Sequence, residues 1–173
     1  MTTVKILEVT GWEAALDAAR VTRRKPLLNK MPSREWKLKM LRAEHSPIRL
    51  VTVRWVWEGL PYWVSVHFVR HKVGIEHFVS TQREDITHVP RNTRLQTELV
   101  NHMCVANAQA IINISRRRLC KKASPETRQA WQMFVDALAK VDPELASVCV
   151  PNCVYRGRCY ELEPCGRRIE QNG

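Results

Sequence analysis

Alternating apolar and polar residues make the segment from Arg49 to Gly59, "RLVTVRWVWEG", the most regular pattern in the chain. One side of this segment carries only apolar side chains, namely Val51, Val53, Trp55 and Trp57. A period of two places these side chains on the same face of a sheet, and valine and tryptophan favour strands. We therefore predict a strand over 49–59 with one buried, aromatic face.

Helical spacing of apolar residues predicts helices elsewhere in the chain. The segment "YWVSVHFVRHK" fits a strand or a helix by residue type, and the proline before it favours a helix. Ser33 and Ser124 stand at positions suited to N-caps, the latter followed by Pro125. The predicted helices span 11–22, 33–43, 62–72, 105–123 and 125–141, with a short one after Pro143, while 4–9 is a strand and 73–104 is strand and loop.

These elements predict one α/β (α+β) domain, with a mixed sheet flanked by helices over residues 1–148 and an irregular, cysteine-rich tail over 149–173. No apolar run reaches the roughly 20 residues that a membrane-spanning helix needs. The first residues lack the basic-then-apolar pattern of a secretory signal, so we expect a cytoplasmic location.

The net charge of +11 and the pI near 9.8 favour anionic partners. Nucleic acids, nucleotides, phosphorylated metabolites and acidic lipids all fit this excess, and composition does not choose among them.

Six cysteines are many for a cytoplasmic chain, where disulfides are disfavoured. The tail contains no Cys-x-x-Cys pair, so its signal for metal is weak, and unpaired thiols are the favoured interpretation. The alternative is a structural zinc site that ties the tail to the end of the 105–121 helix, with His102 and Cys104 as further donors. Its ligands would be Cys120, Cys153, Cys159 and Cys165.

A cationic triplet, Arg70-His71-Lys72, stands at the end of the 62–72 helix, and after seven more residues comes Ser80. Cations commonly end helices because they offset the helix dipole, so residue type alone favours a solvated helix end. Ser80 begins a second polar cluster, however, with Gln82 and Arg83 close behind it.

This arrangement resembles the signature of flavin-dependent thymidylate synthases, which is Arg-His-Arg, seven residues and then Ser. Downstream, "NAQAIINISRRR" is similar to the family helix that starts Asn-Ala-Arg and carries an arginine eleven residues after the Asn, as Asn107 and Arg118 do here. On a helix, eleven residues return to within about 20°, so both side chains point the same way, about 16 Å apart. The resemblance covers about residues 4–148.

The resemblance implies transfer of a one-carbon unit from methylenetetrahydrofolate to C5 of a pyrimidine deoxynucleotide, dUMP to dTMP. In this family reduced FAD supplies the hydride, NADPH re-reduces the flavin, and the active sites lie between subunits of a homotetramer. Arg118 is the implied catalytic residue, because a guanidinium in a dry pocket stabilises the anion left by loss of the pyrimidine N3 proton. Residue type alone would instead place Arg118 in a solvated basic run, "SRRRLCKK".

The resemblance assigns further residues by position. The implied flavin-binding residues are Ser46, Arg70, His71, Lys72, Asn107, Gln109 and Asn113. The implied substrate-binding residues are His67, Arg70, Ser80, Gln82, Arg83 and Arg118. For Ser46, a turn before Pro47 is an equally good interpretation.

The chain also departs from the family pattern. Lys72 replaces an arginine and loses its planar fork, and His77-Phe78 replaces the usual Asn-Glu. Only 27 residues separate Ser80 from Asn107, where the family has dozens of residues including helices. These differences leave open another substrate, such as dCMP, hydroxymethylation, or a member that binds nucleotide without turnover. The rival class is a basic nucleic-acid-binding module that uses "RRRLCKK" and the 22–42 segment.

Overall fold

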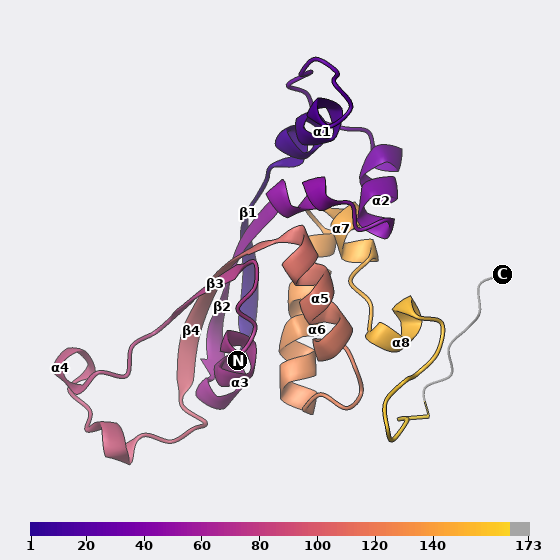
Figure 1. Ribbon diagram of the computed structural model, residues 1–173. Coiled ribbons are helices and arrows are strands. Elements are labelled where there is room, and N and C mark those ends of the chain that lie inside the picture. Colours follow the sequence, from indigo (N-terminus) through magenta and orange to yellow (C-terminus); the bar gives the residue numbers. More distant parts are fainter. Residues whose placement is uncertain (167–173) are drawn as a thin grey trace.

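The computed structural model describes residues 1–166, which fold around a four-stranded sheet of order β1-β2-β4-β3 (Figure 1). The strands are β1 (Thr3–Thr10), β2 (Thr52–Pro61), β3 (Ile75–Val79) and β4 (Leu99–Asn107). The predicted α/β class is confirmed, but all three ladders are antiparallel, so the strand directions are not mixed as we expected.

The helices fall close to their predicted positions. Those predicted over 11–22, 33–43 and 62–72 and after Pro125 and Pro143 are all present. Within residues 1–166, none of the helices is long and apolar enough to cross a bilayer. The helical elements are α1 (Trp12–Val21), α2 (Arg34–Arg42), η1 (Ser46–Leu50), α3 (Tyr62–Val69), α4 (Glu84–Thr87), η2 (Arg91–Thr93), α5 (Ala108–Arg118), α6 (Pro125–Ala139), α7 (Pro143–Ser147) and α8 (Asn152–Tyr155).

Two predicted boundaries and one predicted cap differ from the structure in detail. The 49–59 strand starts only at Thr52, because the residues after Pro47 form the turn η1. The helix predicted over 105–123 loses its first three residues to β4, since alternating burial continues through Asn107. Ser124 occupies the N-cap position of α6, yet its hydroxyl donates to Thr127 Oγ1 at 2.7 Å instead of capping a backbone N–H.

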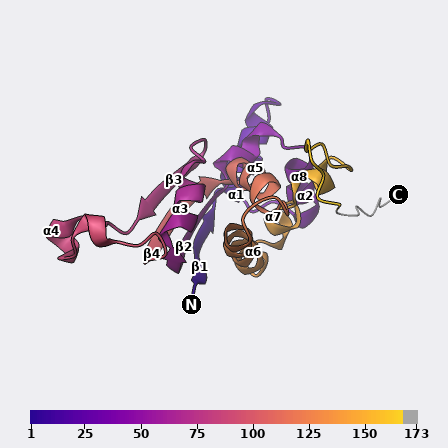
Figure 2. The same cartoon turned by 90° about the horizontal axis from the view of Figure 1, so that it is seen from below.

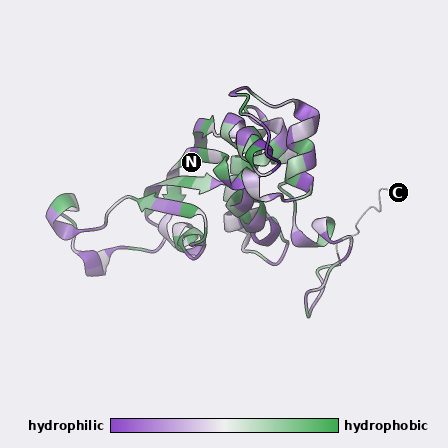
Figure 3. Cartoon of the chain, turned by 45° about the horizontal axis from the view of Figure 1, so that its top comes forward, coloured by the Kyte–Doolittle hydropathy of each residue, from purple (hydrophilic) through white to green (hydrophobic). Residues whose placement is uncertain are grey.

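The core lies between one face of the sheet and helices α3, α5 and α6. Trp55 and Trp57, the aromatic residues predicted to face inward from β2, are fully buried. The Trp57 ring stacks on Phe68 of α3 with centroids 4.7 Å apart, and the Trp55 ring lies 4.3 Å from that of Phe134 of α6. Figure 3 shows this segregation, with apolar positions along the strands and the helices beside them and a hydrophilic η2 away from the core.

A projecting arm, residues 80–98, leaves the sheet at the end of β3 and returns at the start of β4 (Figures 1 and 2). It contains only the short turns α4 and η2, and both views show it pointing away from the helical body. The returning end of the arm is attached to the start of α3, because Tyr62 N–H donates a hydrogen bond to the Glu98 carbonyl oxygen at 2.8 Å. The substrate residues predicted over 80–83 therefore lie at the base of this arm.

Gly11 sits at the junction of β1 and α1, with φ of +93°. A Cβ at this position would lie 2.0 Å from the carbonyl oxygen of Leu50, which is backbone and cannot swing away. We expect Gly11→Ala to lower the free energy of unfolding by more than about 2 kcal/mol, because it combines the left-handed strain with this clash. Urea denaturation followed by circular dichroism measures the loss.

Gly157→Ala is the matched control, since φ is +73° there and no atom lies within 4 Å of the added Cβ. That variant carries the strain without the clash, so we expect a loss of at most about 1–2 kcal/mol. Equal losses in the two variants would contradict the role assigned to the Leu50 contact.

Candidate active site

The ends of α3 and α5 meet through the side chain of Arg118. Its Nε donates to His71 Nε2 at 2.9 Å, and its Nη2 donates to the carbonyl oxygen of His67 at 2.5 Å. Two parts of the predicted site that lie 47 residues apart in sequence are thus in direct contact. The roles predicted for these residues stay predictions, but their convergence is a feature of the fold.

Asn107 fixes where α5 begins. Its Oδ1 accepts from Ala110 N–H at 2.9 Å and caps the helix, while its own N–H donates to the Gly74 carbonyl at 2.9 Å. A Cβ on Gly74 would lie 2.6 Å from Asn107 Nδ2, so this close approach requires glycine. The cap holds the start of α5 beside the segment that follows Lys72, and Asn107 Nδ2 remains the part of the side chain able to bind a ligand.

His67 belongs to a hydrogen-bond chain that the sequence did not reveal. Ser124 donates to Thr127 Oγ1, and the Thr127 hydroxyl lies 2.8 Å from His67 Nδ1. Thr127 can therefore donate its own hydrogen to His67 Nδ1. Burial, helped by Arg118 and Arg70, lowers the pKa of His67, which agrees with a neutral ring. The one available signal was the Ser124-to-Thr127 spacing at the start of α6.

The surroundings of Arg118 are strongly cationic. The salt bridges formed within residues 1–166 involve other cations, so Arg70, Lys72 and Arg118 have no carboxylate partner in that part of the chain. Burial, and then the charge of Arg70, lowers the pKa of Arg118. A bound anion would relieve this repulsion, so the arrangement favours phosphate or a deprotonated ring as ligand.

Lowering the pH from 7 to 4.5 is expected to destabilise the fold through His71. Burial first, and then Arg118 and other nearby cations, lowers the pKa of His71 from 6.5 to about 4. Between these values the unfolded chain binds a proton that the folded chain does not, so the free energy of unfolding falls as pH drops. The limit is about 1.4 kcal/mol per pH unit, and partial exposure of the ring reduces it.

Urea unfolding at several pH values measures this slope. His71→Gln should flatten the slope between pH 4.5 and 6.5, whereas His88→Gln, which changes an exposed ring, should leave it unchanged. A slope that is identical in both variants would remove His71 as its source.

The flavin residues predicted on α5 divide between two faces of that helix. Asn107 caps the start of α5 and Arg118 contacts α3, whereas Gln109 Nε2 donates to Glu44 Oε2 at 2.6 Å and to Asn113 Oδ1 at 3.4 Å. Arg116 joins this second group through its ion pair with Glu44. Ser46 is exposed two residues after Glu44 and makes no contact with Arg118.

Glu44 is the residue at this second face that sequence reasoning missed. Burial alone would raise its pKa, but hydrogen bonds from Arg116, Gln109 and Tyr155 outweigh burial and lower it. The Arg116 guanidinium also lies 3.6 Å from the centre of the Tyr155 ring. This face is electrically balanced, unlike the cationic face around Arg118.

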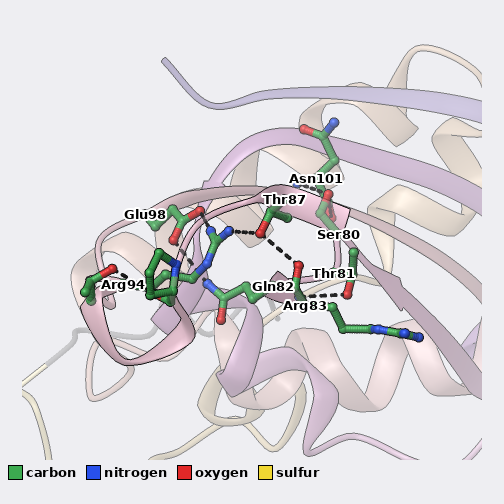
Figure 4. Close-up of polar contacts among 10 residues, drawn as sticks. Ser80, Thr81, Gln82, Arg83, Thr87, Arg94, Glu98 and Asn101 are labelled. Atoms are coloured by element: carbon green, nitrogen blue, oxygen red, sulfur yellow. Dashed lines mark hydrogen bonds and ion pairs between the residues drawn. The ribbon is translucent and has the colours of Figure 1, made fainter. Parts of the chain in front are cut away.

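The predicted substrate residues of the arm are held by the arm itself (Figure 4). Asn101 N–H donates to Ser80 Oγ at 3.0 Å, Gln82 Nε2 donates to Glu98 Oε2 at 3.4 Å, and Arg83 pairs with Asp85 at 2.5 Å. Within residues 1–166, none of the three contacts Arg118 or His71. Within residues 1–166, the two predicted halves of the substrate site are therefore not joined by a direct polar contact.

Arg94 organises the arm, a role that the sequence did not indicate. Its nearly buried side chain pairs with Glu98 and donates to Thr87 Oγ1. These contacts link α4 to the segment that leads into β4.

The alternative of a zinc site in the tail stays a prediction, and the arrangement within residues 1–166 does not bring its proposed ligands together. The cysteines there are unpaired thiols, and no three of Cys120, Cys153, Cys159 and Cys165 bring their sulfurs within ligand-sharing distance. Cys153 lies within α8 and is buried, whereas the other three are half-buried in irregular chain. Spacing in sequence did not predict proximity because the tail has little regular structure.

The side chains of the basic run at the end of α5 do not all point into solvent. Arg116 is turned toward Glu44 and Arg118 toward His71, which leaves Arg117, Lys121 and Lys122 exposed. Two of the three arginines are therefore committed to contacts inside the fold, which weakens the nucleic-acid interpretation.

Comparison with known proteins identifies the fold. No protein-family model matches this chain, and no curated protein matches it by sequence. A solved structure of Thymidylate Synthase X (ThyX) from Helicobacter pylori with FAD and dUMP is similar at a TM-score of 0.70 and 12% identity, covering 87% of this chain and 99% of that one. A UMP/dUMP methylase, PolB from Streptomyces cacaoi bound with 5-Br dUMP, is similar at 0.66 and 13%, covering 86% and 94%. The chain therefore has the fold of flavin-dependent thymidylate synthases.

Proposed function

We propose that this chain is a flavin-dependent enzyme that transfers a one-carbon unit from methylenetetrahydrofolate to C5 of a pyrimidine deoxynucleotide, converting dUMP to dTMP. The observation that carries the proposal is the group of cations around Arg118 that have no carboxylate partner within residues 1–166, on a fold shared with proteins solved with FAD and dUMP. Both ligands are anions with flat, hydrogen-bonding rings, which suits guanidinium groups.

The residues at the end of α3 fit FAD. Arg70 and Lys72 are exposed cations that would bind its diphosphate, and Asn107 Nδ2 lies beside Gly74, where the backbone allows close approach. When bound, FAD would carry the hydride and NADPH would reduce it, with folate supplying the carbon. The protein supplies binding, orientation and charge.

Arg118 would bind the pyrimidine. His71 and the His67 carbonyl take one hydrogen each from its guanidinium, which fixes the plane of the group and leaves three N–H donors for a ligand. The neutral His71 ring adds no further positive charge to the site. In this half-buried position the guanidinium would stabilise negative charge on the ring after loss of the N3 proton.

A second copy of the chain would complete the site. Gln109 and Asn113 lie on the face of α5 opposite Arg118, and Ser80, Gln82 and Arg83 lie on the projecting arm. All of these residues can serve one flavin and one nucleotide only if neighbouring subunits contribute them. This supports the homotetramer that we predict from the resemblance.

The proposal is tested with the purified full chain. We expect it to bind FAD, to oxidise NADPH and, with methylenetetrahydrofolate, to convert dUMP offered side by side with dCMP, as followed by mass spectrometry. A protein that stays colourless with FAD and retards DNA with a steep salt dependence would instead support the nucleic-acid module. Product from dCMP, or a hydroxymethylated product, would retain the enzyme class and correct the substrate or the reaction.

A further inference from the structure

Three potential metal ligands meet beneath α3, apart from the cysteine tail. His77 on β3 and His102 and Cys104 on β4 point to the inner face of the sheet, and their donor atoms all lie within 4.8 Å of one another. His102 and Cys104 are 0% exposed, while His77 is half-buried. The cross-strand register, which pairs His77 with Cys104, brings these side chains together.

A backbone contact fixes the tautomer of His77. Its Nε2 lies 2.8 Å from the carbonyl oxygen of His71, and a carbonyl can only accept, so Nε2 carries the hydrogen. In the neutral ring, Nδ1 then presents its single lone pair to His102 Nε2 at 3.0 Å and to Cys104 Sγ at 3.4 Å.

The one lone pair of His77 Nδ1 can accept only one of the two neighbouring hydrogens. If His102 donates from Nε2, the Cys104 thiol competes with it for the one lone pair of His77. If the thiol donates, two nitrogen lone pairs face each other at 3.0 Å. In either case His102 Nδ1 is buried and has no hydrogen-bond partner among residues 1–166. Protonating a ring would put a charge among the aromatic side chains of Trp57 and Phe68.

We propose that His77 Nδ1, His102 Nε2 and Cys104 Sγ bind a first-row metal cation of borderline softness, Zn²⁺. A single cation accepts the three converging lone pairs at once. Two imidazoles and a thiolate are ligands that zinc prefers, with a water in the fourth position. Metal–nitrogen bonds of about 2.0–2.1 Å and a metal–sulfur bond of about 2.3 Å separate tetrahedral donors by roughly 3.4–3.6 Å, so a small outward shift of the rings is enough.

The proton balance of this step is simple. The Cys104 thiol releases its proton to solvent, and the ring proton of His102 resides on Nδ1 while Nε2 binds the metal. Metal affinity therefore rises with pH. The hydrogen bond from His77 to the His71 carbonyl orients the ligand ring, as such contacts do in metal sites. The ion would also tie the sheet to the end of α3, next to the contact between His71 and Arg118.

Cobalt titration of the metal-free, reduced full chain tests the proposal. We expect about one Co²⁺ per chain to bind with a thiolate-to-cobalt charge-transfer absorption, and Zn²⁺ to abolish that absorption by displacement. Cys104→Ala should lose the absorption. Cys149→Ala, which removes another buried thiol, and the double variant Cys159→Ser/Cys165→Ser should retain it.

Three results would overturn the site: no charge-transfer absorption in the unmodified chain, its persistence in Cys104→Ala, or its loss in the tail double variant. Cooperative thermal unfolding shows whether each variant is folded. Should Cys104→Ala fail to fold, His77→Gln replaces it, because this side chain is only half-buried, and it should likewise lower Co²⁺ affinity at least about tenfold.

Discussion

Arg118→Ala is expected to lower nucleotide turnover by at least about 10²–10³-fold while the chain stays folded. The substitution removes the donors that we assign to the pyrimidine and also the contact with His71 Nε2. Because Arg118 is half-buried and sits at the end of α5, its loss opens no cavity in the core. Steady-state kinetics with dUMP, together with urea unfolding, separates the two effects.

Arg117→Ala is the matched control for this prediction. It removes the same charge from the neighbouring position of α5, but its side chain is exposed. Turnover should change little, since only long-range electrostatics is altered. Arg118→Lys should remain strongly impaired, because lysine keeps the charge and loses the planar fork. Unchanged turnover in Arg118→Ala would remove Arg118 from its proposed role.

Trp131→Ala is expected to have the largest effect on stability, lowering the free energy of unfolding by about 3–5 kcal/mol. Trp131 is 0% exposed and its ring packs 4.8 Å from that of Phe134. Its Nε1 donates to Ser115 Oγ at 2.9 Å, so truncation also takes a hydrogen bond from a buried hydroxyl. Urea unfolding gives the loss as a shift of the midpoint at constant slope.

Trp36→Ala provides the comparison, because this tryptophan of α2 is only partly buried at the edge of the same core. We expect a loss of about half that of Trp131→Ala or less, since less apolar area leaves the interior. A larger loss in Trp36→Ala would mean that the aromatic cluster under the sheet does not dominate stability.

Strong local patterns predicted most of the fold. The alternation through Trp55 and Trp57 specified a buried strand face, and Ser33 marked the start of α2 through the bond that its hydroxyl accepts from Trp36 N–H at 3.3 Å. The predicted helix boundary was wrong where the helical and the strand periods both fit the same residues. Val105 and Ala106 suit a strand or a helix, and the cap at Asn107 decides between them.

The candidate site was predicted in part, for a related reason. The eleven-residue spacing placed Asn107 and Arg118 on one face of α5, and the contact with His71 agrees with that expectation. The sequence did not indicate Glu44 or Thr127 as site residues, because neither belongs to a local motif. Both residues reach the site only through tertiary packing. Glu44, which has φ of +47°, follows the end of α2, and Thr127 lies in the first turn of α6.

The clasp between Ser80 and Asn101 closes the base of the arm, with Ser80 N–H donating to the Asn101 carbonyl at 2.9 Å. The arm beyond this clasp is a loop between two paired strands. The length of the loop does not set the register of β3 on β4, which the strand pairing fixes. Insertions and deletions can therefore accumulate there at little energetic penalty to the domain. Changes of length in this loop would leave the aromatic core beneath the sheet in place.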